Sequence, residues 1–179
     1  MKQKMNILNN LQWRASGKYW LIIFVLLLLD QVSKQWIVAQ YQYLQGDVIT
    51  AFFNIVRVHN TGAAFSFLAD ASGWQRQFFV VLGVVAALAL TVWLLRVANH
   101  KKPVFAFAAL GLGLLPMSLS LVITGAVGNV IDRVRYGYVV DFLDFHVLGY
   151  HWPAFNVADS CIVVGAISLV LHDFLAAKK

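Results

Sequence analysis

The distribution of hydrophobic and polar positions divides the chain into four long apolar segments. They cover approximately residues 19–39, 78–95, 103–131 and 155–177, and most charged residues lie between or beyond them. A helix needs about 18 to 20 mostly apolar residues to cross a bilayer, and each segment reaches that length. The pattern therefore predicts an all-α membrane protein, a bundle of four transmembrane helices that forms one domain over residues 1–179.

The two longer polar segments, 41–73 and 134–154, have a different character. Residues 53–60 alternate with a period of two, which is typical of a β-strand, and the Asn-Thr-Gly sequence that starts at Asn60 favours a turn. We therefore expect a small β-rich segment on the membrane surface. Within the third span, Pro116 predicts a kink.

Charge indicates which side each segment faces. Of the fourteen Lys and Arg residues, nine lie in the N-terminal segment, in the loop at 96–102 and at the C-terminus. Positive residues favour the cytoplasmic side, so both termini are expected there and segments 41–73 and 134–154 outside. The net charge of +6 thus reflects membrane topology, and no nucleic-acid partner is expected.

Several kinds of site are absent from the sequence. The single cysteine, Cys161, excludes an internal disulfide. The five histidines form no His-x-x-x-His pair, and there is no glycine-rich phosphate loop. Ser160 lacks the flanking glycines of a nucleophile elbow. We therefore expect neither a metal nor a cofactor.

Two groups of polar residues lie within or at the ends of spans. Asp30 and Lys34 are four apart and share a helix face, so they can form a structural ion pair or bind a lipid head group. Asn129, Asp132 and Arg133 share another face. They could form a polar helix cap, or Arg133 could donate to substrate carbonyls or to a phosphate. Asp132 adjoins basic neighbours at positions 133 and 135, which would hold it ionised in a structural role.

A third group contains the candidate catalytic carboxylates. Asn156 and Asp159 are spaced like a capping box at the start of the fourth span. Asp141 follows an extended apolar segment, whose neighbours would raise its pKa. Asp141 and Asp159 could form an acid/base pair that cleaves a peptide bond. The same residues could serve as the relay of a small proton- or ion-coupled transporter, and these two alternatives remain open at this point.

Five motifs in register distinguish the alternatives further. The chain resembles lipoprotein signal peptidase, the type II signal peptidase of bacteria, from its first span to its fourth. The motifs are Asp30-x-x-Ser33-Lys34, Asn60-x-Gly62-Ala63-Ala64-Phe65, Gly128-Asn129-x-x-Asp132-Arg133, Gly137-x-Val139-Val140-Asp141-Phe142 and Phe155-Asn156-x-Ala158-Asp159. One departure is Thr124, where the family often has a glycine.

The resemblance implies an intramembrane-type aspartic endopeptidase of the bacterial cytoplasmic (inner) membrane, with its active site near the outer face. Its substrate would be a prolipoprotein carrying diacylglycerol on a cysteine, cut just before that cysteine, and membrane lipid would be a second partner. Inhibition by globomycin-type cyclic peptides and a monomeric state are also implied. The catalytic residues would be Asp141 and Asp159. The supporting or substrate-binding residues would be Asp30, Lys34, Asn60, Gly62, Asn129, Arg133, Asn156 and Ala158.

Overall fold

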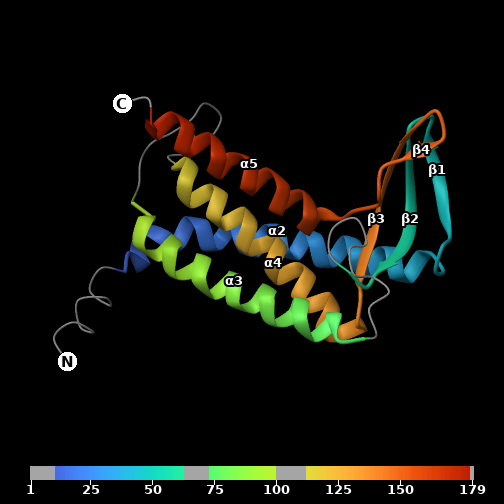
Figure 1. Ribbon diagram of the computed structural model, residues 1–179, viewed down its shortest axis with the longest axis horizontal. Coiled ribbons are helices and arrows are strands. Elements are labelled where there is room, and N and C mark those ends of the chain that lie inside the picture. The colour runs from blue at the N-terminus through green and yellow to red at the C-terminus, as the bar shows by residue number, and fades with distance from the viewer. Residues whose placement is uncertain (1–10, 63–72, 100–111, 178–179) are drawn as a thin grey trace.

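The computed structural model describes residues 11–62, 73–99 and 112–177 (Figure 1). Within these ranges, four helices are long and apolar enough to cross a membrane. They are α2 (Trp13–Gln40), α3 (Gln75–Val97), α4 (Leu114–Tyr136) and α5 (Val157–Ala177). The predicted four-helix membrane fold is confirmed.

The third helix differs most from its predicted span. Residues 103–111 of that span lie outside the described residues, and α4 begins at Leu114. Pro116 therefore lies in the first turn, where its missing N–H removes no intrahelical hydrogen bond, so the basis for the predicted kink is absent. The helix continues past Ile131 to Tyr136. Hydropathy ended the span too early, because Asp132 and Arg133 find polar partners inside the protein.

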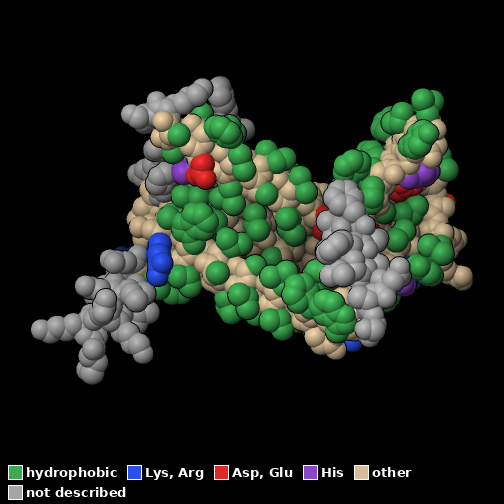
Figure 2. Space-filling view, in the orientation of Figure 1, with side chains coloured by type: hydrophobic (Ala, Val, Ile, Leu, Met, Phe, Trp, Pro, Cys, Tyr) green, Lys and Arg blue, Asp and Glu red, His purple; other side chains and the backbone are tan. Residues whose placement is uncertain are grey.

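Helix α4 lies at the centre of the bundle. Most of its side chains are buried, whereas α2, α3 and α5 leave many large apolar side chains exposed, as expected of helices that face lipid (Figure 2). Two glycines allow close packing against its neighbours. A Cβ at Gly125 would collide with the carbonyl oxygen of Ala158, and one at Gly128 would lie 2.6 Å from the Asp30 carboxylate. The close approach places polar residues of α4 beside the start of α5.

A four-stranded antiparallel sheet lies at one end of the bundle, opposite the end where α2 begins and α5 finishes (Figure 1). Its strands, in both chain and spatial order, are β1 (Gly46–Thr50), β2 (Phe53–Asn60), β3 (Val139–Val147) and β4 (Tyr150–His151). The strand expected from the alternation at 53–60 is confirmed as β2. The predicted small β-rich segment is this sheet.

The register of β2 and β3 positions the polar residues of the sheet. Asn60 pairs with Val139 and Val58 with Asp141, and the register shifts between Ile55 and Val58. Before β3, Gly137 ends α4 with a φ of 87°, a left-handed conformation that glycine adopts easily. Within β3, the N–H groups of Phe142 and Leu143 both donate to the Phe155 carbonyl oxygen, at 3.0 and 2.9 Å. These bonds attach β3 to the segment that leads into α5.

Candidate active site

Asp141 lies on β3, with only 2 % of its surface exposed. Its carboxylate accepts two hydrogen bonds from side-chain amides, 3.0 Å from Asn60 Nδ2 and 2.7 Å from Asn156 Nδ2. Asn60 comes from the end of β2 and Asn156 from the residue just before α5. Three separate elements therefore meet at this carboxylate.

Asp159 lies in the first turn of α5. Its backbone N–H donates to Asn156 Oδ1 at 2.9 Å, and its Oδ2 accepts the Asn156 N–H at 3.3 Å. This reciprocal arrangement is the capping box that the sequence predicts. Capping does not use the whole carboxylate, because Asp159 Oδ1 also accepts a 2.7 Å hydrogen bond from Asn129 Nδ2 on α4.

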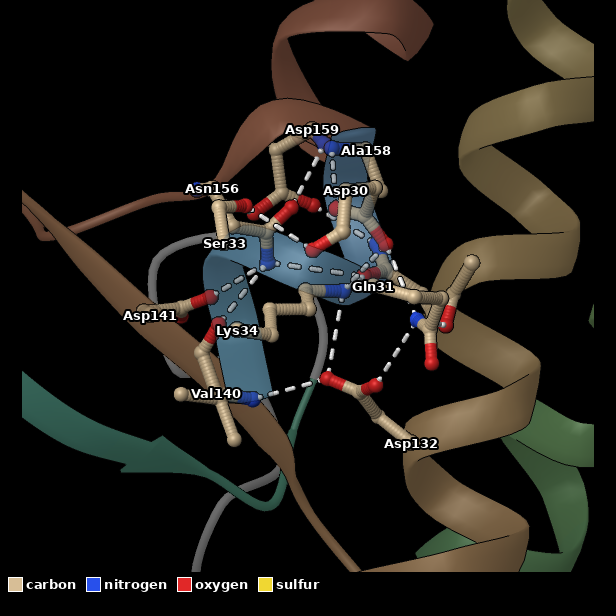
Figure 3. Close-up of polar contacts among 12 residues, drawn as sticks. Asp30, Gln31, Ser33, Lys34, Asp132, Val140, Asp141, Asn156, Ala158 and Asp159 are labelled. Atoms are coloured by element: carbon tan, nitrogen blue, oxygen red, sulfur yellow. Dashed lines mark hydrogen bonds and ion pairs between the residues drawn. The ribbon is translucent and has the colours of Figure 1, made fainter. Parts of the chain in front are cut away.

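Asn156 is the residue that joins the two carboxylates (Figure 3). Its side-chain N–H donates to Asp141, while its side-chain oxygen and backbone N–H bond to Asp159. Among the described residues, neither aspartate forms a salt bridge. Both are held by amide groups, which carry no charge.

Burial has a large effect on Asp141. It raises the pKa of the carboxyl from its ordinary 3.8 to about 7, with a further contribution from the negative charge of Asp159. The hydrogen bonds from Asn60 and Asn156 and the charge of Lys34 act in the opposite direction but are outweighed. Asp141 is therefore suited to take up and release a proton near neutral pH. The predicted effect of its apolar surroundings agrees with this direction.

Lys34 lies close to this pair but forms ion pairs with two other carboxylates (Figure 3). Its Nζ is 3.0 Å from Asp30 Oδ2, 3.1 Å from Asp132 Oδ2 and 3.1 Å from Asn129 Oδ1. The predicted pairing of Asp30 with Lys34 is confirmed. Since Lys34 is 1 % exposed and all three of its N–H donors have acceptors, the structure favours the structural pair over lipid head-group binding.

Asp132 differs from the sequence prediction. We expected its basic neighbours on α4 to hold it ionised, whereas the observed ion pair is with Lys34 on α2. Successive residues of a helix point in directions about 100° apart, so sequence neighbours on α4 face different surroundings. Asp132 Oδ2 also accepts the backbone N–H of Val140, at 3.1 Å.

Arg133 follows Asp132 on α4, and its guanidinium bonds to two backbone carbonyl oxygens. Its NH2 group donates to the Gly62 carbonyl oxygen at 2.6 Å and its NH1 group to the Asn129 carbonyl oxygen at 3.4 Å. The guanidinium also lies over the Phe79 ring, 5.1 Å from its centroid. Its Nε is buried and has no partner among the described residues.

A cavity of about 610 Å³ opens beside these residues, between α3, α4 and α5. Its polar side chains include Asn60, Asn129, Arg133 and Asp159. Most of the remaining lining is apolar and comes from the facing sides of the three helices. The site therefore combines a carboxylate and a guanidinium with an apolar space.

The structure brings together all the predicted site residues. Asn60, Asn129 and Asn156 bond to the two carboxylates, Gly62 bonds to Arg133, and Ala158 donates its N–H to Asp30 Oδ1 at 2.9 Å.

Sequence reasoning missed Gln31, whose amide nitrogen lies 3.0 Å from Asp30 Oδ2 and 3.2 Å from Asp132 Oδ1. A glutamine next to an aspartate inside an apolar span could have indicated it, because buried polar groups need partners. Asp144, whose role the sequence left open, lies apart from these residues and bonds to Asn54 Nδ2 at 2.8 Å and His151 Nδ1 at 2.8 Å.

Comparisons with known proteins identify the family of the chain. The sequence profile of the family described as signal peptidase (SPase) II matches residues 22–175. A lipoprotein signal peptidase of Ralstonia nicotianae is 48 % identical over 167 residues, which are 93 % of this chain and 86 % of that protein. One of Cupriavidus taiwanensis is 51 % identical over 161 residues, which are 89 % of this chain and 85 % of that protein.

Solved structures show the same relationship. A bacterial membrane enzyme solved at 2.3 Å resolution matches with a TM-score of 0.72 and 31 % identity, covering 90 % of each chain. A second, at 1.9 Å, matches with a TM-score of 0.67 and 32 % identity, covering 87 % of this chain and 92 % of the other. The resemblance seen in the five motifs is confirmed: the chain belongs to the signal peptidase II family.

Proposed function

We propose that this protease removes the signal peptide from diacylglyceryl-modified prolipoproteins, cutting before the lipidated cysteine, with Asp141 and Asp159 as its catalytic pair. Membership of the signal peptidase II family and the names of its relatives support the substrate class. The observation that carries the catalytic assignment is the shared Asn156, which bonds to both carboxylates in a buried site.

Peptide hydrolysis needs one group to take a proton from water and another to protonate the carbonyl oxygen. Two neighbouring carboxylates that share one proton supply both, because like charges oppose double ionisation. Water would attack the scissile carbonyl as the ionised carboxylate accepts its proton and the protonated one donates to the carbonyl oxygen. Proton transfer to the amide nitrogen would then release the amine. The rate should follow a bell in pH whose limits belong to the pair.

The residues around the pair suit these steps. Asparagine amides offer both donors and acceptors, so they can bond to an aspartate in either protonation state. The Arg133 guanidinium would hold a carbonyl of the substrate backbone, and the position of Arg133 in the cavity lining supports this assignment. The apolar part of the cavity matches the apolar character of a lipidated signal sequence.

The transporter alternative needs polar groups that could pass a proton on along the span. The buried hydroxyls of α4 nearest the middle of the helix are Ser118, Ser120 and Thr124. Each donates to the carbonyl oxygen four residues earlier in its own helix, at 2.8, 2.7 and 2.9 Å. Because these donors are already used within the helix, the arrangement favours the hydrolase.

For the topology, we propose a bacterial inner-membrane protein with both termini in the cytoplasm and the sheet outside, acting as a monomer. Single-cysteine labelling of intact cells in a Cys161→Ser background tests this. Leu148→Cys, at a position 94 % exposed in the turn between β3 and β4, should react with an impermeant reagent, and Asn99→Cys should react only after lysis. Labelling of Asn99→Cys in intact cells would show that the topology is the opposite of the one proposed.

The activity itself is tested with purified protein and a lipidated prolipoprotein. We expect a product shortened by the signal peptide, and we expect a globomycin-type cyclic peptide to inhibit its formation. The same precursor without diacylglycerol is the control and should remain uncut. No shortening of the lipidated precursor by folded protein would refute the proposed function.

A further inference from the structure

The buried ammonium of Lys34 has three acceptors, and each acceptor is also bonded to the segment that carries a catalytic aspartate. Asp30 Oδ1 accepts the N–H of Ala158, the residue before Asp159, at 2.9 Å. Asp132 Oδ2 accepts the N–H of Val140, the residue before Asp141, at 3.1 Å. Each catalytic residue is thus preceded by a backbone N–H held by a buried carboxylate.

The third acceptor reaches the pair through a side chain. Asn129 Oδ1 lies 3.1 Å from Lys34 Nζ, and Asn129 Nδ2 donates to Asp159 Oδ1 at 2.7 Å. Accepting from Lys34 fixes which end of the amide faces Asp159, because the oxygen is already turned toward the ammonium. A single ammonium on α2 therefore connects α4, α5 and β3 (Figure 3).

We propose that Lys34 is a positioning residue that sets the relative placement of Asp141 and Asp159. It acts through Asp30, Asp132 and Asn129, and the inference rests on the proposed function. Lys34 itself forms no salt bridge with the catalytic pair within the described residues, and it is not among the residues that line the cavity. Lys34 therefore does not touch the substrate. Besides the effect of its charge on Asp141, it influences the reaction through the placement of the two aspartates.

A positioning role makes a different prediction from simple charge compensation. Asp30, Lys34 and Asp132 together carry one net negative charge. Lys34→Met alone would leave two buried carboxylates without their cation. It would therefore fold poorly whether Lys34 positions the pair or only compensates charge. The double variant Lys34→Met/Asp132→Asn keeps the net charge at minus one, and the new amide oxygen can still accept the Val140 N–H. It removes the common ammonium and one carboxylate oxygen of Asp132, so the hydrogen bond from Gln31 Nε2 to Asp132 Oδ1 is lost as well.

The experiment compares kcat, KM and melting temperature of the purified double variant with those of wild type, using a lipidated prolipoprotein. We expect folded protein with kcat about 10- to 100-fold lower, since small misplacements of reacting groups have effects of this size. KM should stay within about threefold, because Lys34 lies outside the cavity lining. Wild-type kcat in the folded double variant, or a higher KM at unchanged kcat, would overturn the inference.

Two further variants complete the test. Asp132→Asn leaves Lys34 paired with Asp30 and replaces the double variant in the assay if that variant does not accumulate. It should lower kcat at least severalfold. An unchanged kcat would overturn the inference. Asp141→Asn, assayed in parallel, separates failure of the positioning role from failure of the aspartic mechanism. If Asp141→Asn is inactive while the double variant and Asp132→Asn are both fully active, only the positioning role is refuted. If it cleaves normally, the aspartic mechanism fails as well.

Discussion

Two pairs of aspartates, all buried except the half-buried Asp159, lie next to each other at the sheet end of the bundle, and the pairs differ in the groups that they contact. Asp30 and Asp132 both contact the Lys34 ammonium. Among the described residues, Asp141 and Asp159 accept hydrogen bonds from neutral amides of side chains and backbone, and neither forms a salt bridge. A neighbouring cation favours the carboxylate anion, whereas asparagine can bond to either protonation state. The comparison separates two carboxyl groups beside a cation from two beside neutral amides, and the proposed mechanism assigns proton exchange to the second pair.

The same contrast appears within one strand. Asp141 and Asp144 are both on β3, and both are largely buried. For Asp144, burial favours a higher pKa, but the hydrogen bonds from Asn54 and His151 and the charge of His151 outweigh it and hold the pKa below its usual value. For Asp141, burial dominates and raises the pKa to about 7. Asp144 is thus a natural control for Asp141.

The largest effect is expected from Asp159→Asn, which removes one half of the proton traffic and keeps a side chain that can still accept the capping hydrogen bond. Cleavage should fall by about 10²- to 10⁴-fold, the usual contribution of acid–base catalysis. The melting temperature should change little. A variant that lost stability and activity together would instead indicate that capping is the main role of Asp159.

A smaller effect is expected from Arg133→Lys. Lysine keeps the positive charge but cannot present several N–H groups in one plane to the Gly62 and Asn129 carbonyl oxygens and to a substrate. We expect kcat/KM to fall about 10- to 100-fold, equivalent to roughly 1.4 to 2.7 kcal/mol. Steady-state kinetics would show it, and a wild-type rate would return Arg133 to a purely structural role.

The smallest effect concerns stability. Because folding raises the pKa of Asp141 from 3.8 to about 7, the folded protein binds this proton more tightly than the unfolded chain. The resulting stabilisation is complete below the unfolded pKa and is lost as the pH rises through about 7, at up to about 1.4 kcal/mol per pH unit. Melting temperatures in detergent should therefore fall between pH 5 and pH 8. Asp141→Asn should flatten this dependence, and an equally steep fall in the variant would refute the shift.

The sequence predicted the helices and strands, and which polar residues gather at the site, better than it predicted the partners of those residues. Four apolar spans, the strand at 53–60 and the capping box at Asn156 depend on local spacing, which a sequence displays directly. The partner of Asp132 does not depend on local spacing, because Lys34 is far away in the chain and comes close only when α2 packs on α4. The role of Gln31 and the need for a small residue at Gly128 depend on the same packing.

Side-by-side cleavage of a lipidated prolipoprotein by Asp141→Asn and Asp144→Asn tests the central claim most directly. Both changes replace a largely buried carboxylate on β3 with its isosteric amide, so they perturb the strand to a similar extent. We predict that Asp141→Asn is essentially inactive and that Asp144→Asn retains most of the wild-type rate, with both proteins folded. Near wild-type cleavage by Asp141→Asn, or equal losses in the two variants, would contradict the assignment of Asp141 to the catalytic pair.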